Sequence, residues 1–245
     1  MKKLLYILTI VFAFGCNSED APDCLKSAGE RVTRTVVLAD FDQLYINNDF
    51  NVLITQGNVQ NVAVTIGENL FKEIDFEVIE GELHITNHIS CRWVRKYDFP
   101  TINITVPIIS KIEITGGSVI QTVGGPLNVP SIELRSQDCN GDFYMDINSN
   151  DLIVWSNEIS NFILTGQVYN LTVSFTSGDG LFKGDNLLTT NATVFHNGTN
   201  TITVNVSNEL KGNINSTGNL KYVGNVPVTI DVKENGRGHL INGSN

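Results

Sequence analysis

The chain has 245 residues and a formal net charge of −10 at pH 7, and 41% of its residues are apolar, which is enough to bury a core. Charged residues make up only 17%, which excludes a coiled coil and a disordered acidic tail, and the acidic balance argues against a nucleic-acid partner. Asparagine is unusually frequent, and together with the many glycines it indicates a chain rich in turns.

The first fifteen residues have the pattern of a secretory signal peptide. Lys2 and Lys3 precede an apolar run that ends near Phe14 and is too short to span a bilayer comfortably. The run closes on Ala13-Phe14-Gly15-Cys16, which resembles the lipobox of bacterial lipoproteins, in which Cys16 would carry the lipid. We therefore expect a signal peptide over residues 1–15 and a lipidated tether over residues 16–37. An ordinary cleavable signal with an incidental cysteine is the alternative.

Acidic residues follow directly after Cys16. The segment Asn17-Ser18-Glu19-Asp20 resembles the signal that sends Bacteroidota lipoproteins to the outer cell surface. We expect an outer-membrane lipoprotein that is exposed on the cell surface and attached to the membrane through its N-terminal lipid. A domain that faces the periplasm is the alternative.

Three further cysteines would lie in an oxidising compartment after export. Three thiols allow one bridge and one free thiol. Cys24 lies in the predicted tether and Cys91 in a polar turn, so a disulfide between them would pin the tether to the folded domain. Cys139 lies in a turn and is expected to be the free thiol.

Residues 38–115 contain short alternations of apolar and polar residues. Phe50-Asn51-Val52-Leu53-Ile54 and Ile102-Asn103-Ile104-Thr105-Val106 are typical of strands with one buried face. Glu-Gly and Gly-Gly pairs separate such segments, and these residues favour turns. Helical periodicity is nearly absent, and residues 69–74 are expected to form a helical turn at most.

From residue 131 onward the predicted strands recur at nearly constant intervals. One series of strand residues consists of Ile132, Leu152, Leu171, Ala192 and Leu210. A second series, whose successive steps closely match those of the first, consists of Phe143, Phe162, Leu181, Ile202 and Leu220. A period near twenty with two strands per unit is typical of a β-solenoid, in which each unit is one coil.

We therefore predict an all-β fold, a right-handed parallel β-helix (β-solenoid) with coils of about 20 residues and two short strands per coil. Residues 38–115 are expected to supply opening strands with insertions, residues 116–235 regular coils, and residues 236–245 a C-terminal tail. An antiparallel β-sandwich is the alternative architecture.

Several strand-turn motifs resemble one known family, the head GIN domain. They are Phe41-Asp42-Gln43-Leu44-Tyr45-Ile46, Gly81-Glu82-Leu83-His84-Ile85, Ile112-Glu113-Ile114-Thr115-Gly116 and Asn219-Leu220-Lys221-Tyr222-Val223-Gly224-Asn225. The family is described as a putative auto-transporter adhesin head and is common among Bacteroidota lipoproteins. The resemblance covers about residues 38–230 and implies a β-helix, with a head GIN domain expected over residues 38–235. It implies no catalytic residue.

No motif of the chain predicts catalysis or a cofactor. A lyase on a parallel β-helix would need clustered carboxylates with an Arg or Lys base on one face, whereas the basic residues after position 131 are scattered. Asp138 and Asp142 are expected to be solvated turn acids, and a calcium loop around them is the alternative. No metal site is expected, because the four histidines are interpreted as polar surface residues: His84, His88, His196 and His239.

Four residues are candidates for a ligand site. Trp93, Arg95 and Tyr97 form the one aromatic-basic cluster in an acidic chain, and Trp155 lies on a predicted strand where its ring could face solvent. Ordinary packing is the alternative interpretation of all four.

The resulting hypothesis is a lipid-anchored outer-membrane solenoid that acts as a non-enzymatic, adhesin-like or scaffolding module. Its expected partners are the membrane, through the lipid, and a glycan or a surface protein. A carbohydrate-active enzyme on the same fold and a periplasmic envelope-maintenance lipoprotein are the two alternatives.

Overall fold

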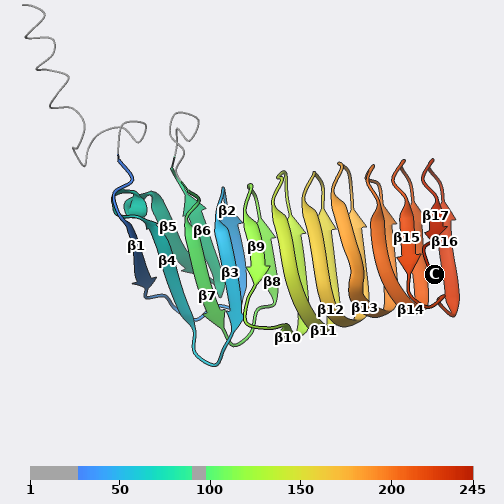
Figure 1. Ribbon diagram of the computed structural model, residues 1–245, viewed down its shortest axis with the longest axis horizontal. Coiled ribbons are helices and arrows are strands. Elements are labelled where there is room, and N and C mark those ends of the chain that lie inside the picture. The colour runs from blue at the N-terminus through green and yellow to red at the C-terminus, as the bar shows by residue number, and fades with distance from the viewer. Residues whose placement is uncertain (1–26, 90–97, 245) are drawn as a thin grey trace, which may run out of the picture.

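The computed structural model describes residues 27–89 and 98–244, and these form a β-solenoid of about seven turns (Figure 1). Strands make up 63% of the structure and helix 3%, which confirms the all-β prediction. The helical segment is the 3₁₀ helix η2 (Glu68–Glu73), where the sequence predicts a helical turn at most. Within the described residues, no helix is long and apolar enough to cross a membrane.

One continuous 17-stranded sheet wraps around the core, and we name its two sides face 1 and face 2. Face 1 begins, in spatial order, with β5 (Ile74–Ile79), β6 (Glu82–Asn87), β2 (Gln43–Asn47) and β8 (Lys111–Ile114). It continues with the C-terminal parts of five longer strands, namely β10 (Leu127–Ser136), β11 (Asp142–Ser156), β12 (Asn161–Phe175), β13 (Leu181–His196) and β14 (Ile202–Ile214). It ends with β16 (Thr229–Glu234). Face 2 consists of β1 (Arg31–Val36), β4 (Asn61–Gly67), β7 (Thr101–Val106), β3 (Asn51–Gln56), β9 (Val119–Thr122), the N-terminal parts of β11 to β14, β15 (Leu220–Val223) and β17 (Leu240–Asn242).

In the regular coils a single long strand serves both faces. β11, β12, β13 and β14 are 13 to 16 residues long and bend at one edge of the solenoid, so the two short strands predicted for each coil are continuous here (Figure 1). Their parallel register aligns the first predicted series as one inward column, namely Ile132, Leu152, Leu171, Ala192 and Leu210. This column confirms the solenoid prediction.

The second predicted series is wrong by one residue in its third coil. Phe162 pairs with Phe182, and it is Phe182 that pairs with Ile202, whereas Leu181 pairs with Asn161. The turn between β12 and β13 is one residue longer than the turn between β11 and β12, and the longer turn shifts the register. Because Leu181 and Phe182 are both apolar, hydrophobicity alone does not identify the inward residue.

Aromatic side chains stack through the core. The Phe143 and Phe162 rings are parallel, with centroids 4.7 Å apart, and Phe175 lies 5.8 Å from Phe162. Phe175 pairs in register with His196, whose ring lies edge-on to it. The solvent exposure of His196 is 0%, so its interpretation as a surface histidine is wrong.

The following turn explains how a histidine is accommodated in this apolar column. His196 Nε2 lies 2.8 Å from the Asn200 carbonyl oxygen, and Gly198 N–H donates to His196 Nδ1 over 3.3 Å. Both ring nitrogens therefore have backbone partners when the imidazole is neutral and protonated on Nε2.

The N-terminal part departs from a simple stack in sequence order. β2 and β3 lie between the β6–β7 coil and the β8–β9 coil, so the first coil in sequence is not the first in space (Figure 1). The β4–η2–β5 excursion makes this possible, because it adds antiparallel strands outside that coil: β4 pairs with β7 and β5 with β6. β1 and β17 lie in the ranges predicted as tether and tail.

Amide side chains line up along both edges of the stack. At the bend, Asn170 donates to Asp151 over 3.0 Å, and Asn191 donates in turn to Asn170 over 3.1 Å. At the opposite edge, Asn215 donates to Asn197 over 2.7 Å and Asn235 to Asn215 over 2.8 Å. The coil repeat brings these asparagines together, and their ladders account for part of the asparagine-rich composition.

Candidate functional site

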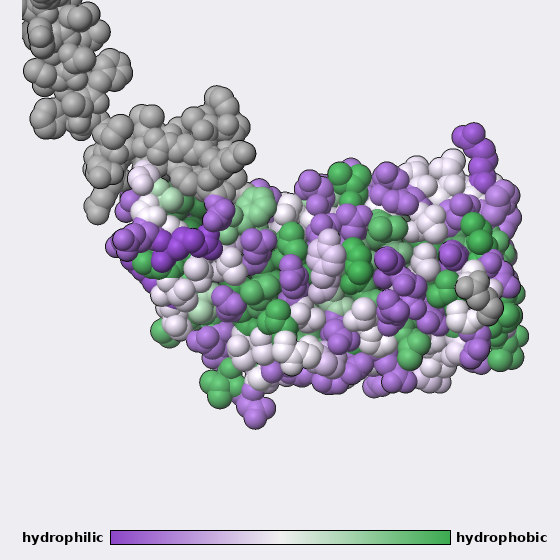
Figure 2. Space-filling model, viewed as in Figure 1, coloured by the Kyte–Doolittle hydropathy of each residue, from purple (hydrophilic) through white to green (hydrophobic). Residues whose placement is uncertain are grey.

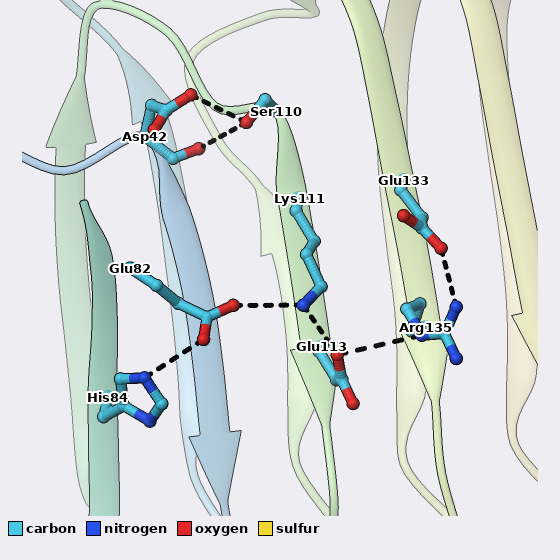
Figure 3. Close-up of polar contacts among 8 residues, drawn as sticks. All are labelled: Asp42, Glu82, His84, Ser110, Lys111, Glu113, Glu133 and Arg135. Carbon is cyan, nitrogen blue, oxygen red and sulfur yellow. Dashed lines mark hydrogen bonds and ion pairs between the residues drawn. The ribbon is translucent and has the colours of Figure 1, made fainter. Parts of the chain in front are cut away.

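A network of charged side chains covers the outside of face 1 across β6, β8 and β10. These residues alternate with the inward apolar residues of the same strands and therefore point to solvent. Figure 3 shows them side by side, and we name this set the charged strip: Glu82, His84, Lys111, Glu113, Glu133 and Arg135.

The contacts of the charged strip run without a break from β6 to β10. Lys111 Nζ lies 3.1 Å from Glu82 Oε1 and 2.8 Å from Glu113 Oε2. Arg135 Nε lies 3.7 Å from the same Glu113 oxygen, and Arg135 Nη1 lies 2.9 Å from Glu133 Oε1. All three carboxylates of the strip are therefore paired with a cation.

This pairing does not suit acid–base catalysis. Burial lowers the pKa of Lys111, but hydrogen bonds to Glu113 and Glu82 outweigh it, so the pKa lies above its ordinary value. A lysine that acts as a general base near neutral pH needs a lowered pKa. The charged strip therefore ties β6, β8 and β10 together, and its lysine is not a free base.

The strip ends at Trp155 of β11. The guanidinium carbon of Arg135 lies 4.6 Å from the centroid of the Trp155 ring, in cation–π contact. In register, Trp155 pairs with Ser174 of β12, and Ser174 pairs with Phe195 of β13, which is 43% exposed. We name the outward row Trp155, Ser174 and Phe195 the aromatic platform.

The aromatic platform is partly exposed and carries no charge of its own, and Arg135 covers one face of the Trp155 ring. Neighbouring strands lie about 4.8 Å apart, so the backbones of Trp155 and Phe195 are separated by roughly 10 Å with the small Ser174 between them. The adjacent outward row adds Ile153, which is 40% exposed, and two threonines. Such a surface offers two rings for stacking and hydroxyl groups for hydrogen bonds.

The side of the molecule drawn in Figure 2 does not carry one large apolar patch. Figure 2 shows green apolar and purple polar side chains interspersed along the length of the solenoid. A large continuous apolar patch is typical of a permanent protein interface. On this side of the molecule apolar and polar side chains are mixed, as on most protein surfaces.

Of the ligand residues predicted from the sequence, Trp155 is described and lies on the aromatic platform. Trp93, Arg95 and Tyr97 lie outside the described residues, as do the predicted lipidation site, Cys16, and the predicted disulfide pair, Cys24 and Cys91. Phe195 was not predicted, although the coil repeat connects Trp155 to Ser174 and then to Phe195.

The remaining candidates are occupied by structural contacts. Cys139 is a free, buried thiol, with its Sγ 3.0 Å from Ser136 Oγ. Asn157 donates to Asp138 over 2.7 Å, and Asn161 donates to Asp142 over 2.7 Å, so both turn acids bond to the next coil. Over residues 27–89 and 98–244, no three His, Cys, Asp or Glu side chains gather in a way that could hold a metal ion.

Solved structures of similar fold include proteins from Bacteroides and Parabacteroides. A putative adhesin from Bacteroides fragilis NCTC 9343 is 20% identical with a TM-score of 0.78, over 87% of this chain and 97% of that chain. Two structures from Parabacteroides distasonis ATCC 8503 cover the same shares: a putative lipid binding protein, 20% identical with a TM-score of 0.63, and a putative adhesin, 14% identical with a TM-score of 0.65.

These likenesses show the fold. No curated protein matches the chain. The family model described as "Putative auto-transporter adhesin, head GIN domain" matches residues 40–226, which is most of the chain. The chain therefore belongs to the head GIN domain family.

Proposed function

We propose that this protein is a lipid-anchored, non-enzymatic binding module of the outer membrane that faces the cell exterior and contacts a glycan or a protein through the aromatic platform. The observation that carries the proposal is the row Trp155, Ser174 and Phe195, in which two partly exposed rings flank a small polar residue on a rigid sheet. Rings held on strands lose little conformational freedom when a ligand stacks on them.

The charged strip supports a binding role over an enzymatic one. The rival enzyme would need carboxylates and a base that are free to act on a substrate. Glu82 and Glu113 instead converge on Lys111, and Arg135 holds Glu133. Within the described part of the chain, these groups are engaged with one another.

The proposed location rests on the sequence and on the family. Cys16 follows a lipobox-like segment, and the acidic residues after it resemble a surface-export signal. The family description and two of the similar structures carry the word adhesin. A solenoid on a tether presents a long side to the surroundings, which suits weak contacts repeated over many molecules.

The test is a binding screen with the full chain carrying Cys16→Ala, so that the protein has no lipid. Immobilised glycans and extracellular proteins are the probes. The double variant Trp155→Ala/Phe195→Ala should lose at least tenfold in binding signal. Tyr144→Ala is the matched control, because Tyr144 is 44% exposed but lies on face 2, so its loss should leave binding unchanged.

Two results would contradict the proposal. Equal binding by the double variant and the parent chain would show that the aromatic platform is not the contact surface. Release of new reducing ends from a bound glycan would establish the carbohydrate-active enzyme instead. Thermal unfolding of each variant, measured in parallel, separates loss of binding from loss of fold.

A further inference from the structure

A second surface feature lies at the edge where the long strands bend. An open groove with a volume of about 550 Å³ crosses β10, β11, β12 and β13 there. Three successive residues from each of the first three strands and one from β13 line it, namely Asn128, Val129, Pro130, Asn148, Ser149, Asn150, Gln167, Val168, Tyr169 and Thr190. We name it the bend groove.

The lining of the bend groove is polar but carries no charge. Four of its residues have side-chain amides, three have hydroxyls, and the other three are apolar. Amides donate and accept hydrogen bonds side by side, which matches neighbouring hydroxyl groups on a ligand. Because no carboxylate, histidine, lysine or arginine lines the groove, the ligand that it suits is uncharged.

The floor of the bend groove is held rigid by its own hydrogen bonds. Gln56 at the end of β3 accepts from the Asn128 backbone N–H over 2.8 Å, and its amide donates to the Asn128 carbonyl over 2.9 Å. Asn148 donates to the Asn128 side chain over 3.0 Å and accepts from the Gln167 N–H over 3.0 Å. A floor that is already ordered loses little entropy on binding.

Two side chains of the groove could engage a ligand without giving up an existing contact. The Tyr169 side chain is 56% exposed, so its ring is accessible to a ligand. The buried Ser149 hydroxyl oxygen has no hydrogen-bond partner among the described residues, so turning it toward a ligand would break no hydrogen bond. An exposed ring beside amides and hydroxyls is a surface on which a sugar ring can stack while its hydroxyls form hydrogen bonds.

The strand pairing argues against a peptide as the ligand. An extended peptide usually binds by adding a strand to a free sheet edge. At the groove, Asn148 of β11 is paired with both Asn128 and Gln167, and Gln167 of β12 with both Asn148 and Leu188. These two strands therefore have no free edge there.

We propose that the bend groove binds a neutral saccharide, with Tyr169 as the stacking ring and the amides of the groove as hydrogen-bond partners. This inference deepens the proposed function, on which it rests, by naming a ligand class and a second contact surface. The aromatic platform lies on the outside of face 1, whereas the bend groove lies at the edge between the faces.

The test is isothermal titration calorimetry on the full chain with Cys16→Ala. The probes are neutral oligosaccharides of the gluco, manno, xylo and galacto series, with a uronic-acid oligomer as the charged comparison. At least one neutral series should bind, with an affinity that changes little with salt. Tyr169→Ala should raise the Kd at least tenfold, Tyr169→Phe should leave it nearly unchanged, and Tyr144→Ala should have no effect.

The inference is overturned if no neutral series binds, if only the uronic-acid oligomer binds, or if Tyr169→Ala binds as well as the parent chain. Adhesion measured with the Trp155→Ala/Phe195→Ala variant distinguishes failure of this inference from failure of the proposed function. If adhesion depends on the aromatic platform but no saccharide binds in the groove, this inference is wrong and the proposed function is still supported. Saccharide binding that depends on Tyr169, together with adhesion that Trp155→Ala/Phe195→Ala leaves unchanged, would contradict the proposed role of the aromatic platform and leave the groove as the contact surface.

Discussion

The guanidinium group of Arg135 stacks on the indole ring of Trp155 at 4.6 Å while its Nη1 pairs with Glu133. One side chain thus belongs both to the charged strip and to the border of the aromatic platform. Since Glu113 also approaches Arg135 and is itself held by Lys111, the orientation of Trp155 depends on ion pairs two strands away. Support of this kind holds a binding ring in place before the ligand arrives.

Removal of the guanidinium should therefore expose Trp155 to water. In a Trp93→Phe background Trp155 is the one remaining tryptophan, so its fluorescence can be measured by itself. Arg135→Ala should shift the emission to the red and increase quenching by acrylamide, with a loss of about 1 kcal/mol of cation–π stabilisation. Unchanged quenching would show that Arg135 does not cover the ring in solution.

The charged strip should contribute measurably to stability through Lys111. Lys111→Met removes the cation shared by Glu82 and Glu113, and we expect the free energy of unfolding to fall by roughly 1–3 kcal/mol. Lys183→Met, at an exposed position on face 2, is the matched control and should change the free energy of unfolding by less than about 0.5 kcal/mol. Equal unfolding midpoints in urea for the two variants would contradict a stabilising role for the strip.

His196 should make the fold sensitive to acid. Burial lowers its pKa, and this effect exceeds the opposing effect of hydrogen bonds to the backbone of Asn200 and Asn219. The folded form therefore stays neutral at a pH where the unfolded form, with a pKa of about 6.5, already binds a proton, and stability falls as the pH drops below that value.

We expect His196→Gln to flatten the dependence of Tm on pH between 7 and 5. The comparison of slopes is the relevant readout, because the substitution can also lower stability at every pH. At pH 8, where histidine is neutral in both states, the difference between the two proteins gives the baseline. Parallel slopes for the variant and the parent chain would assign the acid sensitivity to other groups.

Close packing between coils should make Gly212 intolerant of a side chain. Its φ is +152°, and a Cβ there would overlap the Val194 carbonyl oxygen of the preceding coil. Gly125 also has a positive φ, +128°, but a Cβ there would have nothing within 4 Å. Gly125→Ala should cost about 1 kcal/mol from strain alone, whereas Gly212→Ala should cost roughly 3 kcal/mol or more. Equal losses in chemical denaturation would show that the coils can separate to make room.

The regular coils could be predicted from the sequence because one physical rule governs them. Residues one coil apart lie directly above one another, so apolar residues such as Leu152 and Leu171 recur at the coil length. The rule does not locate turns of different length, which is why the pattern favours Leu181 where Phe182 points inward. It also does not predict a buried histidine, because the partners of His196 are backbone groups of the next turn.

The N-terminal part could not be predicted in the same way. The strand pattern predicts short strands where β2 and β3 lie, but it carries no sign that β6 and β7 pair with their outer side, since that placement depends on long-range pairing. The candidate site was predicted only through Trp155. The charged strip was missed because Glu82, Lys111 and Arg135 are far apart in sequence and meet only across the folded sheet, where β2 lies between the strands of Glu82 and Lys111.

The central claim, a binding module displayed on the outside of the cell, is tested most directly by protease treatment of intact cells that express the full chain. We predict that the mature protein is digested while the outer membrane is intact, and that Cys16→Ala abolishes its retention at the surface. A protein that survives until the outer membrane is broken would lie in the periplasm, and the adhesin-like function would then be contradicted.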